Sequence, residues 1–304
     1  MKYPTKLLLL SLLLFIGHSV FAQDEDLLKL AGNDKPKKEY VYGAFKSTRV
    51  IMSQSMEMLR PGVLDFRILH RFGLVSGGAY EFFGLDGGAA VRLGLDYGIS
   101  NKISVGIGRS SNKELDGFFK YRPIQQSTGP SSSPVSLVLV VGSTMSIKTF
   151  PENQGKYEFT DRLSYFYQAI VGRKFSKNFT LQIMPIFLHR NRVDTTGDHN
   201  DIFAPGIGGR IKVSKRVSLN ADYYYVIHKD NGLYPYVTAL YNPMSIGVDI
   251  ETGGHVFQLH FTNSKGLNER YFLTDTEYSW TKGDIFLGFN ISRAFQIKKP
   301  KTGY

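Results

Sequence analysis

The feature that most constrains this chain is a strict alternation of apolar and polar residues, repeated along most of its length. Clear examples are VRLGLDYGI at 91–99, VSLNADYYY at 217–225 and IFLGFNIS at 285–292. A β-strand with two different faces has a hydrophobic period of two residues, whereas an amphipathic helix has a period of about 3.6 residues. The chain is therefore expected to be all-β.

The two faces of these strands differ in a way that favours a membrane barrel over a soluble sandwich. One face carries Tyr, Phe, Leu and Ile, and the other carries Gly, Ser, Asn, Asp and Arg. Strands of about ten residues with an apolar outside and a polar inside are typical of transmembrane barrels, while soluble sheets use strands of about five or six residues. An open edge would leave backbone groups without partners in hydrocarbon, so the sheet is expected to close.

The connections and the strand count complete the predicted architecture. Tight turns alternate with long polar stretches such as TNSKGLNERYFLTDTEYSWTK at 262–282, and short turns opposite long loops are typical of outer-membrane barrels. Twelve alternating segments lie between residues 63 and 295, and residues 40–58 can add one or two more. The sequence therefore predicts a transmembrane antiparallel up-and-down β-barrel of about 12 to 14 strands, with short periplasmic turns and longer extracellular loops.

One phrase recurs three times, as GISNKISVGI at 98–107, KFSKNFTLQI at 174–183 and KVSKRVSLNA at 212–221. Its serines lie 76 and then 38 residues apart, and 76 is twice 38. We interpret the phrase as the periplasmic turn. The repeat length is then one strand up, an outer loop, one strand down and a turn.

The N-terminus predicts export. Two lysines precede LLLLSLLLFIG and the small residue Ala22 follows, which is the pattern of a cleaved signal peptide at 1–22. Residues 23–39 are charged and predict a flexible periplasmic leader, so the barrel is assigned to 40–304. No later stretch approaches a transmembrane helix.

The net charge and the absence of cysteine limit which ligands and bonds the chain can have. The net charge of +11 falls to +9 when the two lysines of the signal leave. No basic helix or aromatic RNA-binding motif accompanies this charge, so nucleic acid is not expected as a partner. The chain has no cysteine, which excludes disulfides and thiolate metal sites.

The alternation also predicts which charges face the inside of the barrel. The basic set is Arg67, Arg71, Arg92, Lys120, Arg122, Arg210 and Lys212. The acidic set is Asp65, Asp96, Asp222 and Asp249, and His260 also faces inward. A basic excess along an open pore would favour anions. Alternatively, these residues pair with one another and fill the barrel, because a twelve-stranded barrel lies between the filled eight-stranded and the open sixteen-stranded types.

Catalysis and metal binding are less well supported by the sequence than simpler explanations. In HVFQLHFTNS at 255–264, His260 lies two positions before Thr262, and Ser264 follows, so a membrane-embedded hydrolase is one alternative. Alternation turns His260 and Thr262 inward, however, which is the wrong side for a lipid substrate. Histidines and aspartates near 189–201 lack regular metal-ligand spacing and are better explained as a solvated loop, and no cofactor or metal is expected. The glycine-rich stretch at 76–90 is either a short plug or a flexible outer loop.

Three runs resemble a known family. FKSTRVIMSQSMEMLRPGVLDFRILHRFG at 45–73, LGLDYGISNKISVGIGRS at 93–110 and HVFQLHFTNSKGLNER at 255–270 are similar to an uncharacterised family of predicted outer-membrane β-barrel proteins from Bacteroidota. The resemblance implies a barrel in the outer membrane and assigns no activity or functional residue.

These observations give a leading hypothesis and two alternatives. The leading one is a non-enzymatic outer-membrane barrel, in contact with lipid, that passes or binds a small and anionic solute. The alternatives are a hydrolase that uses His260 and a structural barrel that docks a periplasmic protein through residues 23–39.

Overall fold

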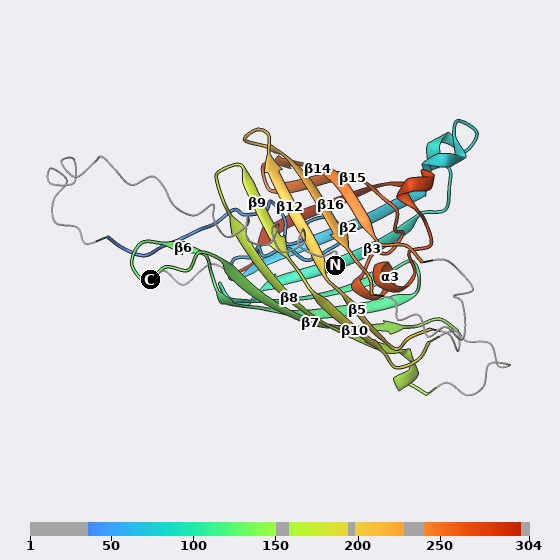
Figure 1. The fold of residues 1–304 in the computed structure, drawn as a ribbon, viewed down its shortest axis with the longest axis horizontal. Coiled ribbons are helices and arrows are strands. Elements are labelled where there is room, and N and C mark those ends of the chain that lie inside the picture. Colours follow the sequence, from blue (N-terminus) through green and yellow to red (C-terminus); the bar gives the residue numbers. More distant parts are fainter. Residues whose placement is uncertain (1–35, 150–157, 194–197, 228–239, 299–304) are drawn as a thin grey trace, which may run out of the picture. The chain divides into compact units, whose positions relative to one another are not determined.

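All but two of the strands in the described residues form one large antiparallel sheet that closes on itself (Figure 1). The computed structural model describes residues 36–149, 158–193, 198–227 and 240–298. The predicted signal peptide at 1–22 and most of the predicted leader at 23–39 lie outside the described residues. Within the described part of the chain, no helix is long and apolar enough to cross a membrane.

The sheet contains fourteen strand segments. In chain order they are β2 (Val63–Leu74), β3 (Ala90–Gly98), β4 (Ile103–Ser110), β5 (Glu114–Ile124), β7 (Ser136–Ser146), β8 (Leu163–Lys174), β9 (Phe179–Ile183), β10 (Ile186–Arg190), β11 (Asp201–Ala204), β12 (Gly206–Lys212), β13 (Val217–Tyr224), β14 (Met244–Thr252), β15 (His255–Thr262) and β16 (Phe286–Gln296). Consecutive strands of this list pair from β2 to β8 and from β12 to β16, and β2 pairs with β16. Between these runs, β8 pairs with both β9 and β10, β10 pairs with β11, and β9 pairs with β12.

Two of the barrel strands are each divided into two segments by an interruption. Pro185 separates β9 from β10, and Pro205 separates β11 from β12. Proline has no backbone N–H, so it interrupts the hydrogen-bond ladder at one position without ending the strand. Counted this way the barrel has 12 strands, which confirms the predicted fold class.

The two faces of the wall follow the predicted alternation. On β3 and β4, Leu93 and Ile107 point outward with exposed fractions of 49% and 64%, while Arg92, the residue before Leu93, is fully buried inside. Glycine supplies space on the crowded inner face: a Cβ at Gly108 would lie 2.2 Å from the Arg92 guanidinium. The outer surface is therefore an apolar belt. The interior holds the buried charges and also an apolar cluster, in which Val138, Val140 and Phe166 of the wall and Val50 and Ile51 are buried.

The repeated phrase forms the same turn at each of its three positions. After β3, β8 and β12, the backbone N–H of Ser100, Ser176 or Ser214 donates to the carbonyl oxygen three residues further on. Each serine Oγ in turn accepts from a backbone N–H two residues ahead, at 3.2, 3.2 and 3.3 Å. Serine hydroxyls close such turns locally, and all three turns lie at one end of the barrel, which we call the short-turn end.

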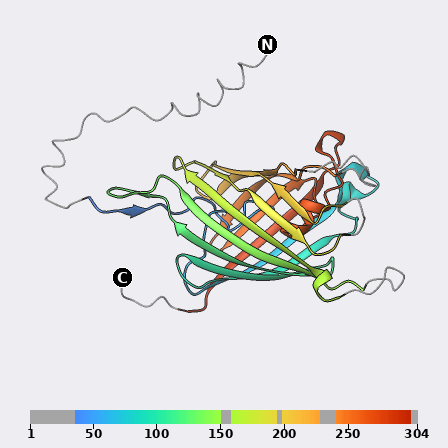
Figure 2. The same cartoon turned by 60° about the horizontal axis from the view of Figure 1, so that its bottom comes forward.

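Residues 40–58 do not add strands to the barrel, contrary to expectation. They run from the short-turn end into the interior, coloured blue in Figures 1 and 2. The barrel is already closed by β2 and β16, so no edge remains for another strand. Only β1 (Glu39–Tyr40) is a strand here, and it pairs with β6 (Ser127–Thr128) in a separate two-stranded sheet. Residues 43–58, called the plug below, fill the lumen.

The opposite, long-loop end is covered by the segment between β15 and β16. It contains the short helix α3 (Glu269–Thr274), which Asn268 caps by accepting from the Tyr271 N–H at 2.9 Å. Six residues do not make a stable helix alone, and here Phe272 and Leu273 are buried against the barrel interior. The glycine-rich stretch 76–90 is an outer loop with exposed Tyr80 and Phe82 and does not enter the barrel.

Candidate functional site

The lumen is the candidate site, because the inward-facing charges and the plug meet there. Among the charges that the sequence predicts to face inward, Lys212 alone is half-buried, and it lies near the short-turn end. The buried ones are Asp65, Arg67, Arg71, Arg92, Asp96, Lys120, Arg122, Arg210, Asp222, Asp249 and His260.

Three of the buried cations donate hydrogen bonds to the plug. Arg67 reaches the hydroxyls of Ser47 and Thr48 at 2.9 and 2.7 Å. Arg210 reaches the carbonyl of Ala44 at 2.9 Å, and Lys120 reaches the carbonyl of Glu57 at 2.8 Å. These acceptors are neutral oxygens, and the charge that the plug sets against this part of the wall is the Glu57 carboxylate, which lies within electrostatic range of Lys120 and Arg210.

One wall carboxylate holds the tip of the plug. Asp222 Oδ2 accepts from the backbone N–H groups of Ile51, Met52 and Ser53 at 3.2, 2.9 and 2.9 Å, and from the Ser53 hydroxyl at 2.8 Å. Hydrogen bonds to an ionised acceptor are about twice as strong as neutral ones. Asp222 is thus the most densely bonded contact between the wall and the plug.

Carboxamide side chains of the wall also bond the plug, and these residues are not among the inward-facing charges that the sequence predicts. Gln182 accepts from the Met56 N–H at 2.9 Å and donates to the Gln54 carbonyl at 2.8 Å. Asn290 donates to the Ile51 carbonyl at 3.2 Å, and Gln258 donates to Val50. Alternation along β9 already places Gln182 on the polar, inward face of its strand. Its hydrogen-bond partners follow only from the position of the plug.

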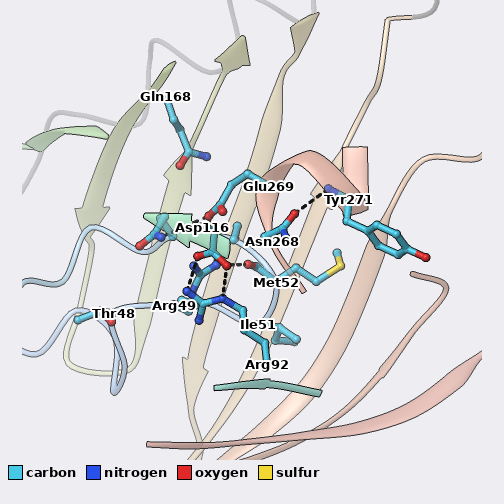
Figure 3. A network of polar contacts seen from close by, with 12 residues as sticks. Thr48, Arg49, Ile51, Met52, Arg92, Asp116, Gln168, Asn268, Glu269 and Tyr271 are labelled. Carbon is cyan, nitrogen blue, oxygen red and sulfur yellow. Dashed lines mark hydrogen bonds and ion pairs between the residues drawn. The ribbon is translucent and has the colours of Figure 1, made fainter. Parts of the chain in front are cut away.

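The plug also contacts the covering segment at the long-loop end. Figure 3 shows Arg49 between the Glu269 carboxylate and the Met52 carbonyl, at 3.1 and 2.9 Å. Gln54 donates to the same carboxylate at 3.3 Å. Both members of the Arg49–Glu269 ion pair are almost fully buried. The plug therefore links the wall to the covering segment at the long-loop end.

Other predicted lumen charges bond within the wall. Arg67 also pairs with Asp65 and Asp96, at 2.6 and 3.6 Å. Arg92 lies in a two-pronged pair with Asp116, at 2.8 and 2.5 Å. Asp249 accepts from Gln258 at 2.6 Å, and Arg122 donates to the Asn101 carbonyl at 2.7 Å near the short-turn end.

His260 does not meet the hydroxyls that the hydrolase alternative requires. Both of its ring nitrogens are buried without a hydrogen-bond partner among the described residues. Thr262 instead donates to the Met244 carbonyl at 3.1 Å, and the Ser264 hydroxyl lies 2.8 Å from that of Thr276. The described contacts therefore do not assemble a nucleophile and base at this position.

Two further groups lie outside the lumen, of which only the first was a candidate from the sequence. His189 and Asp201 pair at 2.6 Å in the outer loop region, and no group of three potential metal ligands gathers within the described residues. On α3, burial raises the pKa of the Tyr271 phenol to about 12, with the negative charges of Asp275 and Glu114 adding to the effect. The phenol is neutral near pH 7 and so presents a hydrogen-bond donor at the mouth.

Fold and site together define a closed β-barrel with an apolar belt outside and a lumen that is lined by charged and apolar side chains and filled by residues 43–58. Residues 45–295 match the family described as a membrane bound beta barrel domain (DUF5777), and the chain belongs to that family. The matched range starts inside the plug, so the plug is part of the family domain.

The chain is also similar at low identity to solved structures, among them two porins and one outer membrane protein. For the NanC porin the identity is 10%, covering 76% of this chain and 98% of that chain, with a TM-score of 0.47. For the KdgM porin these values are 6%, 77%, 99% and 0.45. For the outer membrane protein Omp33 of Acinetobacter baumannii they are 8%, 76%, 97% and 0.39. No curated protein matches this chain.

Proposed function

We propose that this membrane barrel lies in the outer membrane, where it passes or binds a small anionic solute without catalysing a reaction, and that the plug closes the path. The observation that carries the proposal is the pairing of wall cations with neutral plug oxygens. Arg67, Lys120 and Arg210 contact carbonyls and hydroxyls of residues 44–57. When the plug leaves, these cations face the lumen and can contact a passing anion.

The plug is suited to leave because it shares no ladder with the wall. Its polar contacts are to side chains of the wall and of the covering segment, its apolar residues pack in the buried cluster, and its own backbone pairing is limited to a bridge between Arg49 and Gln54. The wall strands, in contrast, are joined by continuous antiparallel ladders around the whole circumference. Side-chain contacts can be exchanged for water or solute one at a time, whereas an opened ladder would expose backbone groups to lipid.

The experiment is single-channel recording in planar bilayers with three forms of the refolded chain. The mature form starts at residue 23, a second form lacks residues 23–40, and a third lacks residues 23–58 and so has no plug. We expect the first two to be closed and the third to show steady events with an anion-biased reversal potential. Silence from the third form, shown by circular dichroism to be folded β, would refute passage through the lumen.

The lumen cations provide the selectivity test in the form without a plug. Arg67→Gln and Arg210→Gln remove wall charges that contact the plug, so each should shift the reversal potential toward cations. Arg109→Gln is the matched control, because Arg109 alternates with inward residues of β4 and lies outside the lumen. An equal shift in all three variants would contradict the assignment of Arg67 and Arg210 to the pathway.

One observation favours docking of a periplasmic protein as a second function. The two-stranded sheet of β1 and β6 lies outside the barrel ladder, and Tyr40 and Tyr42 are exposed beside it, at 49% and 62%. Exposed aromatics next to a short strand suit pairing with an extended peptide. If a partner binds here, Tyr40→Ala with Tyr42→Ala should abolish co-purification of a cross-linked periplasmic protein, and unchanged recovery would contradict it.

A further inference from the structure

We propose that Arg49, Arg71 and His260 form a buried site for a small oxyanion, such as inorganic phosphate, sulfate or a carboxylate, between the plug and the wall. The inference deepens the proposed function, because it gives the chemical class of the solute, but it concerns the closed, plugged protein and needs no passage through the lumen.

The first observation is the alignment of the wall residues. His260 on β15 pairs in register with Gly288 on β16, and Gly288 pairs with Arg71 on β2. A Cβ built at Gly288 would lie 2.4 Å from His260 Nε2 and 2.8 Å from Arg71 Cδ. Glycine at this position therefore lets the imidazole and the arginine stem lie side by side on the inner face.

The second observation is the set of buried donors that have no acceptor among the described residues. Arg71 uses only Nη1, which donates to the His70 carbonyl and to Asn290, both at 3.0 Å. Its Nε and Nη2 have no partner, and neither ring nitrogen of His260 has one. Arg71 is 0% exposed and His260 is 1% exposed. The free Nε and Nη2 atoms of an arginine form the edge that receives a carboxylate or phosphate with two parallel hydrogen bonds.

The third observation is a second guanidinium supplied by the plug. Asn290 accepts from Arg71 and donates to the Ile51 carbonyl, two residues along the plug from Arg49, which lies within electrostatic range of Arg71. The Nε and Nη2 atoms of Arg49 are buried without partners as well. Arginine keeps its charge inside proteins, so the open Nε and Nη2 donors cannot be removed by loss of a proton. Two cations and an imidazole with open donors suit one oxyanion better than isolated waters, because an anion can accept from all three.

Nearby carboxylates do not fill this role. Asp222, which lies within electrostatic range of Arg71, directs Oδ2 to the three backbone N–H groups of the plug and to Ser53. Glu269 uses Oε1 for Arg49 Nη1 and for Gln54. The Asp222 Oδ1 atom has no hydrogen-bond partner among the described residues, but neither carboxylate bonds Arg71 or the Nε and Nη2 atoms of Arg49, and these edges are therefore open to a ligand.

The decisive experiment uses the mature, plugged protein crystallised with sodium selenate, a heavy analogue of sulfate. We expect an anomalous peak within hydrogen-bond distance of Arg71 Nε or Nη2 and of His260. Water alone at this position would overturn the proposal. A peak that persists in crystals of Arg71→Gln would also overturn it, because it would then be an adventitious ion only.

Binding in solution is the companion measurement, made as thermal unfolding of the detergent-solubilised protein at constant ionic strength. Phosphate, sulfate and acetate are compared with chloride. We expect a saturable rise in Tm with one of the oxyanions, lost in Arg71→Gln and weakened at least tenfold in apparent affinity by His260→Gln. Arg71→Lys keeps the charge without the two-donor edge, and it should also lose the effect.

The matched control is Arg122→Gln, which removes one buried cation near the short-turn end and should leave the oxyanion effect unchanged. If Arg122→Gln lost the oxyanion-dependent rise in Tm as fully as Arg71→Gln, the effect would depend on net charge, and the proposed site would be overturned. Because these measurements require no conductance, a silent bilayer experiment would refute passage while leaving the bound oxyanion to be decided separately.

Discussion

The wall and the plug of this barrel are held in place by different kinds of interaction. Wall strands are joined by backbone ladders that continue around the barrel, and any alternating sequence of suitable length satisfies them. The plug has almost no regular structure, and its backbone groups are met by named side chains of the wall, chief among them Asp222, Gln182 and Asn290. The wall should therefore tolerate single substitutions, whereas the plug should depend on a few residues.

The largest effect is expected from Asp222→Ala. The substitution leaves three buried N–H groups of the plug without an acceptor, and each such group costs about 1–3 kcal/mol. The plug should detach while the barrel stays folded. Hydrogen exchange of residues 43–58 should accelerate by at least roughly 100-fold, which corresponds to about 3 kcal/mol.

The control for that prediction is Ser53→Ala, which removes only the hydroxyl bond to Asp222 and should accelerate exchange far less. The comparison between wall and plug would be broken if Asp222→Ala unfolded the barrel, seen as loss of the β signal in circular dichroism, or if it left exchange of the plug unchanged.

An intermediate effect is expected from Glu269→Gln at the other end of the plug. The amide keeps an acceptor oxygen for Arg49 but loses the charge, and a hydrogen bond to a charged group is worth about 1.5–3 kcal/mol. Limited proteolysis after the plug residue Arg49 should become faster, with slower cleavage expected than in Asp222→Ala. Glu81→Gln, in the exposed outer loop, is the control, and matching acceleration there would argue against a specific contact.

The smallest effect is expected in the wall, from Ser214→Ala. This serine accepts from the backbone N–H groups of Arg216 and Val217 at 3.3 and 3.1 Å in an exposed turn. Exposed substitutions of this kind change the free energy of unfolding by about 0.5 kcal/mol or less. Urea unfolding in lipid vesicles should be almost unchanged. A loss comparable to that of Asp222→Ala would show that the wall depends on single side chains too.

The sequence by itself determined the wall. Alternation along β3 and β13 predicts both faces, and the repeated serine phrase predicts turns whose hydrogen bonds prove to be the same at Ser100, Ser176 and Ser214. These features are local: a strand's period and a turn's chemistry depend on residues within about ten positions of each other.

Tertiary structure alone decided what occupies the lumen. Residues 43–58 have no steady period, and their run Val50, Ile51 and Met52 fits a buried strand as well as a packed loop. The partner that fixes the tip of this segment, Asp222, is 169 residues from Ser53. Such a contact exists only after twelve strands have closed and brought distant inner faces around one interior, so the position of the plug, and with it the grouping of Arg49, Arg71 and His260, follows from barrel closure and not from any local pattern.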